Sequence, residues 1–401
     1  MSDDTIDTTD TAHEEPTRRD YVKYGGTIVT GGLLAGCTGD SAGGDNTDTD
    51  SPTTEESTGG ETDASEENET PEDTSYSVTM EPVGTLEFEE PPETWFPFTG
   101  DYADMGVALG QGDGLEAIGL ASRFGSHHYE ELSGVSVGEL TPLYDEGTGK
   151  EVFYELDADL HVIDPKFMVN RLGWSEADVE EIRENVAPWF GNTIFTQVYD
   201  WHDYRHYSLY EAFEKLAAVF QERERYEAFE SYHDEVLDRV QSRLPEETPD
   251  IAVLVPAGVP PESYYPYLVG EGTQSKQWRD LGVRDALAEN DVVDTQGGGG
   301  TIDYETLLDI DPDALAVRIE GDISEEYFRT NVVEHLQNHD VASELSAVQD
   351  GRVFYAGQTY QGPIIHLFQL EMAARGVYPD EFDDEQLFDR QRVADIVNGN
   401  V

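Results

Sequence analysis

SLYEAFEKLAAVFQERERYEAFESYHDEVLDRVQSRL, residues 208–244, is the longest helical stretch of the chain and the one on which the fold depends. It opens with a capping box, Ser208 with Glu211 three residues later, and Pro245 stops it. Apolar side chains recur at helical spacing on both sides of the charged run 221–225, which predicts two helices with a break between them. The second helix would be a rod that connects the parts of the chain before and after it.

Short apolar runs that suit buried strands alternate with helical patterns on both sides of this rod, which implies parallel sheets. We therefore predict an α/β fold of two Rossmann-like lobes, residues 76–207 and 246–401, joined by the helical region 208–245. The expected strands are a hairpin over 78–88 and then 95–98, 117–120, 160–163, 193–195, 251–255, 314–319 and 353–355. The other expected helices are 102–109, one beginning at Ser175, and 274–281 and 364–375, which end at Gly282 and Gly376.

An internal repeat supports two equivalent lobes. KEVFYELDADL, residues 150–160, and YETLLDIDPDA, residues 304–314, each lead into an apolar strand. In each, a glutamate (Glu151 or Glu305) is followed five residues later by Leu or Ile and eight residues later by Asp. A chance match would not be expected at equivalent places in both halves.

Together with other short elements, this repeat resembles the substrate-binding proteins of the iron-siderophore and cobalamin ABC importers. The resemblance covers essentially Tyr76 to Phe382, and its elements are weak singly but specific as a set. It implies a periplasmic-binding-protein fold with a rigid helical hinge, no enzymatic activity, no cofactor, and capture of an iron(III)-siderophore-type chelate for a permease dimer and its ATPase subunits. The matching elements are ALG and AIG within 108–119, LDADL at 156–160, AVQDGRVF at 347–354 and YPDEF at 378–382.

The same resemblance implies a role for the two repeated carboxylates. In the family, one glutamate of each lobe docks onto arginines of the two permease subunits, and Glu151 and Glu305 match those positions. The alternative is two solvated glutamates among many acidic side chains. The basic residue that frequently precedes the family's first strand is replaced here by Glu93-Thr94, so ligand details do not transfer.

Loops that follow the strands should meet in a cleft between the lobes, where sheets of this type bind ligands. Aromatic side chains and sparse arginines suit a bulky, partly anionic chelate, although each could instead be an ordinary side chain packed under a loop. Arg318 is the best single candidate, because an arginine that ends an apolar strand needs a carboxylate or a ligand. The candidates are Tyr102, Arg123, His127, His128, Tyr129, Trp201, His202, Tyr204 and Arg205 in the first lobe and Tyr264, Tyr265, Tyr267, Arg318 and Tyr360 in the second.

Several other functions remain open at this stage. Cobalamin or haem would be alternative cargo within the same family. A free transition metal is a further rival, with His127 and His128 as weak metal-ligand candidates. A secreted hydrolase is a remote alternative, since the G-x-S-x-G match at 134–138 has no convincing strand before it and no long helix after it. The glycine run 297–300 lacks the Gly-Lys-Ser/Thr of a phosphate-binding loop.

The charge of the chain predicts adaptation to high salt. Its 86 acidic and 23 basic side chains give a formal charge of -63. Residues 1–75 hold 20 of the acids and three of the bases, so the globular part keeps an excess of 46 acids. At molar salt the Debye length falls to about 3 Å, which relieves the self-repulsion of such a surface. Nucleic acid is a poor partner for it, because phosphate binding relies on clustered Lys and Arg.

The beginning of the chain predicts export and anchoring. Arg18 and Arg19 are followed by a short, mildly apolar stretch and by small residues before Cys37, the one cysteine of the chain, which therefore makes no internal disulfide. This layout, residues 1–37, resembles the lipobox of a Tat-exported haloarchaeal lipoprotein, with Cys37 lipidated at the outer face of the cytoplasmic membrane. Residues 38–75 are almost entirely polar and acidic, and we expect a disordered tether.

Overall fold

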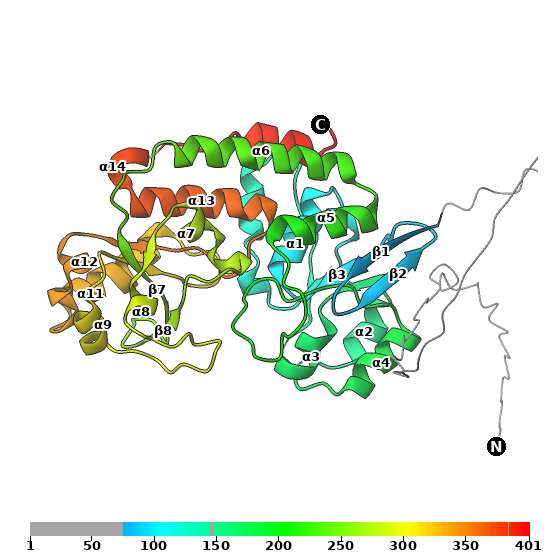
Figure 1. The fold of residues 1–401 in the computed structure, drawn as a ribbon, viewed down its shortest axis with the longest axis horizontal. Helices are drawn as coiled ribbons and strands as arrows, with labels where there is room; N and C mark the ends of the chain where they lie inside the picture. Colours follow the sequence, from blue (N-terminus) through cyan, green and yellow to red (C-terminus); the bar gives the residue numbers. More distant parts are fainter. Residues whose placement is uncertain (1–74, 145–147, 384) are drawn as a thin grey trace, which may run out of the picture.

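The structure is a computed structural model that describes residues 75–144, 148–383 and 385–401. Figure 1 shows two α/β lobes side by side, bridged along one side by the long helix α6 (Arg223–Gln241). The predicted fold of two lobes joined by a connecting helix is therefore confirmed. The predicted signal, with Arg18, Arg19 and Cys37, and nearly all of the tether lie outside the described residues and remain predictions.

The helical region begins and breaks where the sequence predicts. Helix α5 (Leu209–Phe220) starts at a complete capping box, in which Ser208 Oγ accepts the Glu211 N–H and the Glu211 carboxylate accepts the Ser208 N–H. At Gln221 the backbone turns left-handed with φ 58°, and α6 begins two residues later. The break therefore lies between the two helices and not inside either of them. After it the chain changes direction, and α6 runs along both lobes (Figure 1).

The first lobe is built on short parallel strands. Strand β3 pairs in parallel with β6, while β4 pairs in parallel with β5, and isolated bridges at Trp95–Leu115 and His161–Trp189 extend the sheet. A separate antiparallel hairpin, β1 with β2, turns at Gly84 as predicted. The elements are β1 (Tyr76–Met80), β2 (Gly84–Phe88), β3 (Trp95–Pro97), α1 (Gly100–Ala108), β4 (Ala117–Ile118), β5 (Thr141–Pro142), α2 (Glu151–Leu156), β6 (Leu160–Val162), α3 (Pro165–Arg171) and α4 (Glu176–Asn185), with 3-10 turns at Gly112–Gly114, Ala121–Arg123 and Ser126–Glu131.

The second lobe carries a five-stranded mixed sheet in the order β11-β10-β7-β8, with β9 also beside β7. Only β8 is antiparallel to its neighbour, so the predicted parallel arrangement holds for most of the sheet. Its elements are β7 (Asp250–Pro256), β8 (Tyr264–Tyr267), α7 (Lys276–Asp280), β9 (Arg284–Asp285), α8 (Ala286–Glu289), α9 (Tyr304–Ile310), β10 (Ala314–Val317), α10 (Glu325–Phe328), α11 (Glu334–Asn338), α12 (Ser346–Gln349), β11 (Val353–Tyr355), α13 (Pro363–Val377) and α14 (Pro379–Phe382), with a π-helical turn at Arg329–Val333 and 3-10 turns at Thr273–Ser275 and Ala342–Glu344.

The internal repeat corresponds to equivalent helices in the two lobes. Helix α2 ends at Asp157 with φ 46°, and α9 ends at Asp311 with φ 47°. Each left-handed aspartate is followed within three residues by a buried strand, β6 or β10. The matched spacing in the sequence is thus a matched helix, cap and strand, which supports its use as a landmark of both lobes.

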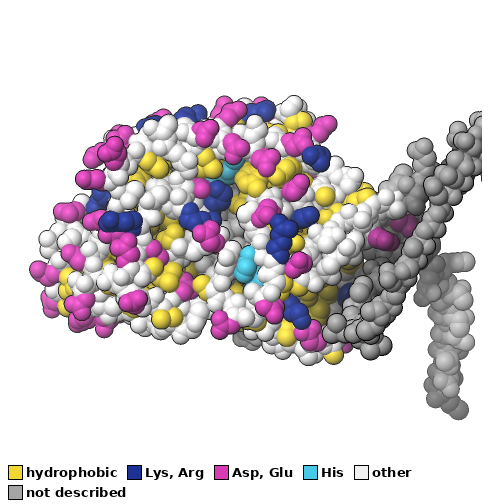
Figure 2. All heavy atoms as spheres, viewed as in Figure 1, with side chains coloured by type: hydrophobic (Ala, Val, Ile, Leu, Met, Phe, Trp, Pro, Cys, Tyr) yellow, Lys and Arg dark blue, Asp and Glu magenta, His cyan; other side chains and the backbone are white. Residues whose placement is uncertain are grey.

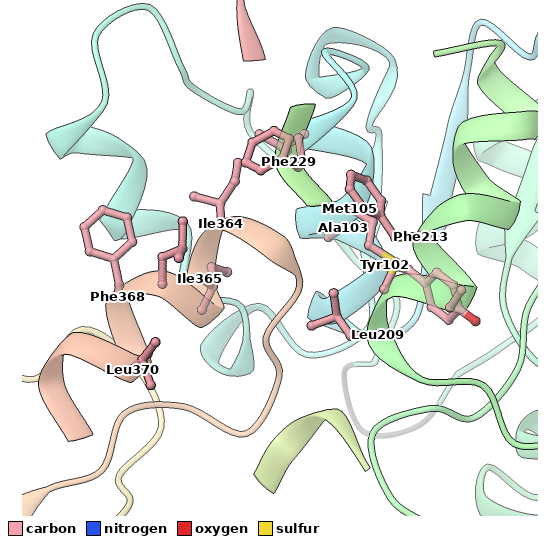
Figure 3. Packing of buried hydrophobic residues seen from close by; sticks show 14 of the residues in the cluster. Tyr102, Ala103, Met105, Leu209, Phe213, Phe229, Ile364, Ile365, Phe368 and Leu370 are labelled. Atoms are coloured by element: carbon pink, nitrogen blue, oxygen red, sulfur yellow. The ribbon is translucent and has the colours of Figure 1, made fainter. Parts of the chain in front are cut away.

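One hydrophobic cluster runs beneath α6 through both lobes. Figure 3 shows Met105 of α1 and Phe213 of α5 on one side of it, Ile364 and Phe368 of α13 on the other, and Phe229 of α6 between them. All five side chains are at most 4% exposed. Each lobe also has a core of its own. Because separating the lobes would expose this shared cluster, large changes in their relative position are opposed by hydrophobic burial.

The C-terminal segment ties the lobes together again. Helix α15 (Arg390–Val397) returns from the second lobe to the first, where Arg390 Nε lies 3.1 Å from the Glu131 carboxylate. Asn398 Nδ2 then donates to the carbonyl oxygen of Ser133 at 3.0 Å. The C-terminus accordingly lies over the first lobe in Figure 1. The predicted unit 246–401 is therefore not confined to one lobe.

Two local predictions are wrong, both because of contacts from elsewhere in the fold. Residues 193–195 form no strand of a sheet, since the neighbouring segment that they contact comes from a 3-10 turn of the other lobe. Gly376 does not end α13, which continues to Val377. A Cβ atom at Gly376 would lie 2.4 Å from the ring of Phe354, so this glycine is needed for close packing.

The surface is acidic, as the composition predicts. Figure 2 shows Asp and Glu side chains over much of the visible face, with fewer Lys and Arg among them. Several of the bases are paired, as Lys150 is with Asp178 at 2.7 Å and Glu181 at 2.8 Å. Such exposed pairs stabilise a fold only slightly, so adaptation to salt rests on the overall excess of acid and remains a prediction. Within the described residues, no helix has the length and apolar character needed to cross a bilayer.

The buried His161 predicts a specific loss of stability in acid. Its ring lies on β6 among Phe96, Phe153 and Trp189, at centroid distances of 4.8–5.1 Å. Neither ring nitrogen has a hydrogen-bond partner in the part of the chain that the structure describes. Burial lowers its pKa to about 3. The imidazole of the unfolded chain takes up a proton below its ordinary pKa of about 6.5, whereas the folded one stays neutral. The folded protein therefore keeps its full stability above pH 6.5 and loses part of its unfolding free energy as the pH falls toward 3.

We expect His161→Phe to remove this loss. At pH 5 the variant should exceed the wild type in unfolding free energy by about 2 kcal/mol more than it does at pH 7.5. Denaturant melts at both pH values in molar salt would measure the difference. A gap between the two proteins that does not change with pH would contradict the assignment of a neutral, buried imidazole.

Candidate ligand-binding site between the lobes

The lobes meet through backbone contacts next to the ends of their strands. The N–H groups of Thr273 and Gln274 in the second lobe donate to the carbonyl oxygens of Ile194 and Phe195 in the first, at 3.0 and 3.3 Å. A Cβ atom at Gly272 would lie 2.1 Å from the Phe195 oxygen, so only glycine allows this approach. The segment expected to be a strand at 193–195 is therefore part of the contact between the lobes.

Arg318 is the central residue of this zone. It follows β10 directly, where its N–H donates to the Leu254 oxygen at 2.8 Å, and its side chain is only 1% exposed. Nη2 donates to the carbonyl oxygen of Gln274 at 3.0 Å, and the guanidinium lies 5.6 Å from the centre of the Tyr267 ring. Nε and Nη1 are buried and have no hydrogen-bond partner among the described residues.

The charge of Arg318 is therefore poorly compensated. Burial lowers its pKa, and the nearby carboxylate of Glu320 opposes that effect. A buried donor without an acceptor costs about 1–3 kcal/mol, and more when it is charged. A guanidinium with two unused donors at the boundary of the lobes is thus able to accept an anionic or oxygen-rich group from outside the chain.

A second arginine faces this zone from the first lobe. Arg123 Nε lies 3.7 Å from Glu320 Oε1, which makes an ion pair across the two lobes. The side chain of Arg123 is 32% exposed and that of Glu320 is 19% exposed. Glu320 also accepts hydrogen bonds from the hydroxyl and the N–H of Thr359. Two guanidinium groups and one carboxylate therefore converge from opposite lobes.

Aromatic rings line the same region. Tyr360 comes from the second lobe but packs edge-on against Phe195 of the first at 5.2 Å, and it is 2% exposed. Trp201 stacks on Tyr199 at 5.0 Å, and the Arg171 guanidinium lies 4.9 Å from the Tyr199 ring. Rings and guanidinium groups together suit a bulky ligand that carries negative charge or many oxygen atoms.

Three predicted ligand residues lie elsewhere, and their placement in the cleft was wrong. Tyr102 is 1% exposed in the core shown in Figure 3, and its hydroxyl is held by the backbone of Asn192 at 3.1 Å. Tyr264 is fully buried within the second lobe, since alternation along β8 turns it inward. Arg205 pairs with Glu211 at 2.7 Å, beside the start of α5.

The remaining candidates are less central. Tyr265 is 41% exposed on the outer face of β8. Tyr204 donates to the buried Asp164 carboxylate at 2.6 Å, and Tyr129 donates to Asp104 at 2.7 Å. His202 is buried, with its ring centre 3.8 Å from that of His206. These hydrogen bonds and packing contacts give Tyr204, Tyr129 and His202 structural roles.

The weak metal candidates do not form a metal site. His128 stacks on Phe368 at 4.5 Å, and burial lowers its pKa to about 3. The His127 ring lies beside it at 4.1 Å. Across the described residues, no group of three or more His, Cys, Asp and Glu side chains is placed to hold a metal ion.

A polar hollow of about 680 Å³ lies on the second lobe, away from the arginine pair, and His335 and His339 border it. Both imidazoles face the Glu262 carboxylate, at 3.5 and 3.8 Å. His339 Nδ1 accepts the N–H groups of Val341 and Ala342, so its proton resides on Nε2, the nitrogen that faces the carboxylate. That tautomer disfavours metal binding there and leaves the hollow without an assigned ligand.

The two repeated glutamates are accessible. Glu151 is the first residue of α2 and Glu305 is the second residue of α9, and both are exposed. Figure 1 places α2 and α9 in opposite lobes, on the side of the molecule away from α6. One partner with two equivalent sites could reach both. Their role in docking remains a prediction.

Sequence reasoning missed Glu320 and Gln274, which contact the two arginines, and Thr359, which holds Glu320. A signal for Glu320 was present, because residues two apart on an extended segment point to the same side, and Glu320 follows Arg318 by two. Gln274 had no such signal, since it contributes only its backbone oxygen. Thr359 acts from a loop 39 residues after Glu320.

Comparison with known sequences finds one family model that matches part of the chain. A model of the family described as "Periplasmic binding protein" matches residues 173–360, slightly less than half of the chain. No protein of curated function matches the sequence. The matched family consists of binding proteins, which agrees with the prediction that the chain is not an enzyme.

Solved structures with the same fold cover both lobes. The siderophore binding protein BauB, bound to two acinetobactin molecules and ferric iron, has a TM-score of 0.53 at 15% identity over 76% of this chain and 98% of its own. The petrobactin-binding protein YclQ of Bacillus subtilis has a TM-score of 0.52 at 14% identity, over 78% of this chain and 99% of its own. A variant of the heme binding protein HmuT has a TM-score of 0.53 at 17% identity, over 75% and 85%. At these identities the likeness shows the periplasmic-binding-protein fold alone.

Proposed function

We propose that this chain is an extracytoplasmic solute-binding protein that captures an iron(III)-siderophore-type chelate between its lobes and delivers it to an ABC importer. The observation that carries the proposal is Arg318, a buried guanidinium between the lobes with two donors that no described residue pairs. Most buried polar groups in proteins are paired, so two open donors on one buried guanidinium call for an explanation. A ligand that supplies acceptors would pair them on binding and recover the free energy lost to burial.

The composition of the site favours an anionic, oxygen-rich chelate over a bare metal ion. Arg123 and Arg318 repel a cation, whereas carboxylate, catecholate or hydroxamate oxygens would accept their N–H groups. The aromatic rings of Tyr199, Trp201 and Tyr360 offer the flat surfaces that a bulky organic ligand needs. The solved relatives named for siderophores and heme support cargo of this size.

Delivery would use the two exposed glutamates. Glu151 and Glu305 are the sites at which we propose that a permease dimer, joined to its ATPase subunits, docks through two basic patches. The lipid on Cys37 and the acidic tether would keep the protein near that permease at the membrane, which raises their effective concentration. The anchor requires the export signal with Arg18 and Arg19 to be processed.

Capture would involve only modest closure of the lobes. The shared hydrophobic cluster and the C-terminal helix already hold them. In addition, Asp104 of the first lobe accepts the N–H groups of Ile364 and Ile365 at the start of α13, both at 2.9 Å. Rearrangement would therefore be confined to side chains and loops around the arginine pair.

Fluorescence titration would test the proposal. Trp201 is the one tryptophan of five that is not buried, and it stacks on Tyr199 beside the arginine pair. In molar salt, ferric siderophores should change the emission of the folded domain at micromolar concentrations or below. Cobalamin, haem and free metal ions complete the panel, and a response to one of them alone would identify that cargo instead.

Trp201→Phe is the matched control for this titration. It should lose most of the emission change while keeping a ligand-dependent rise of the unfolding midpoint, because the change removes the reporter and keeps an aromatic ring. If no member of the panel alters either the emission or the unfolding midpoint of the wild type, the proposed cargo class is wrong.

A further inference from the structure

We propose that Glu320 is a built-in competitor of the ligand: its carboxylate occupies the anion-binding position between Arg123 and Arg318 in the free protein and is displaced by an anionic group of the incoming chelate. This inference rests on the proposed function and adds the charge class that the site selects. It follows from the way in which one carboxylate is shared between groups of both lobes.

The ion pair across the lobes is loose enough to be exchanged. Arg123 Nε lies 3.7 Å from Glu320 Oε1, which is longer than the 2.7–2.9 Å of a strong charge-assisted hydrogen bond. Arg318 makes no hydrogen bond to Glu320, and among the described residues it uses only Nη2, toward a carbonyl oxygen. Arg318 therefore keeps two donors for another anion, while Arg123, which also interacts with the Tyr360 hydroxyl, is held to Glu320 only loosely.

Glu320 itself is held by a group that does not depend on the arginines. Thr359 donates to it through both its hydroxyl and its N–H. If the arginines turn to a ligand, the carboxylate keeps these two bonds and its 19% exposure to solvent. Displacement therefore leaves no buried, unpaired charge behind, which makes the exchange energetically feasible.

The other charged groups of the zone cannot substitute for Glu320. Asp294 accepts the N–H groups of Leu268 and Gln296, both at 2.7 Å, and these local bonds satisfy its carboxylate. Arg171 lies over the Tyr199 ring. Without the Glu320 carboxylate, the positive charge of the two arginines would be uncompensated. With the carboxylate present, the site selects ligands whose negative charge binds the arginines more strongly than Glu320 does.

Glu320→Gln tests the exchange, because glutamine keeps an acceptor for Thr359 and removes the charge. Two probes of different charge are compared in molar salt, ferric citrate as an anionic chelate and ferrichrome as a neutral ferric chelate. The variant should bind ferric citrate about tenfold more tightly than the wild type does and ferrichrome no more than about twofold differently. Equal weakening of both would mean that Glu320 only positions the Thr359 loop, and it would overturn the inference.

Glu271→Gln is the charge-matched control. Glu271 also lies in the second lobe and also contacts an arginine, Arg279, at 3.7 Å, but its side chain is 75% exposed and lies outside the site. The same loss of one negative charge should leave both chelate affinities unchanged. If Glu271→Gln raised the affinity for ferric citrate as much as Glu320→Gln does, the effect would come from the net charge of the protein and not from the position of Glu320. That result would overturn the inference.

A measurement with citrate alone separates this inference from the proposed cargo. Iron-free citrate, at constant ionic strength, should raise the unfolding midpoint of Glu320→Gln more than that of the wild type or of Glu271→Gln. If no chelate binds but citrate shows this order, the proposed function fails and the competitor stands. If chelates bind and citrate does not discriminate among the three proteins, the competitor fails and the proposed function stands.

Discussion

Arg318→Met is expected to abolish chelate binding while leaving the ligand-free domain as stable as the wild type or more so. Loss of a guanidinium that pairs with ligand oxygens should weaken binding at least about 100-fold, or roughly 3 kcal/mol. The change in stability has the opposite sign, because Arg318 is 1% exposed and its Nε and Nη1 find no partner within 75–144, 148–383 and 385–401. Replacement of a poorly compensated buried charge by an apolar side chain of similar length is often neutral or stabilising.

Titration and denaturant melts of the same preparation would measure both effects. Arg352→Met is the matched control, because Arg352 also lies next to a strand of the second lobe and donates to a carbonyl oxygen, that of Val377, at 2.8 Å. It should lose about 1 kcal/mol of stability and keep its affinity. If Arg318→Met unfolds the domain, or binds as the wild type does, Arg318 is a structural residue and the proposed site is wrong.

The double change Glu151→Arg and Glu305→Arg should abolish uptake and leave chelate affinity intact. Each glutamate is exposed in the first turn of its helix, at equivalent places of the two lobes. Reversal would set arginine against the basic patches of the permease, and like-charge contacts of this kind cost several kcal/mol. Uptake of iron-labelled chelate by cells carrying the variant, with titration of the purified protein, would separate docking from capture.

Charge reversal one turn further along the same helices provides the control. Glu155 of α2 and Asp309 of α9 lie four residues after the docking candidates and are also exposed. The pair Glu155→Arg and Asp309→Arg changes the net charge equally and should retain uptake. Wild-type uptake by the first double variant, or equal loss in both, would remove the special role of Glu151 and Glu305.

Most of the architecture follows from local patterns. The capping box at Ser208, the charged break after Phe220 and the stop at Pro245 predict the helical region because each is a property of neighbouring residues. The repeat around Glu151 and Glu305 was predictive for the same reason, since it encodes one helix, one left-handed aspartate and one buried strand in sequence order. Secondary structure of this kind is decided within a few residues.

The candidate site was less predictable, and the arginines show why. Arg318 could be chosen because a charge at the end of an apolar strand is unusual in any environment. Tyr102, Tyr264 and Arg205 were as plausible in sequence, yet the first two are buried in cores and the third pairs near α5. Whether an aromatic side chain faces a core or a cleft depends on the packing of distant elements, which a single sequence does not display.

What the sequence by itself determined was the α/β class, the helical connection, the repeat and the acidic balance, because these are set by periodicity, capping and composition. Only the tertiary structure decided which charges meet. The pairing of Arg123 with Glu320 joins residues almost two hundred positions apart, and the bond from Arg318 to the Gln274 backbone depends on a loop that turns between strands. Such contacts depend on how the two lobes pack, and that packing arises from a shared core beneath α6 and not from any local run of residues.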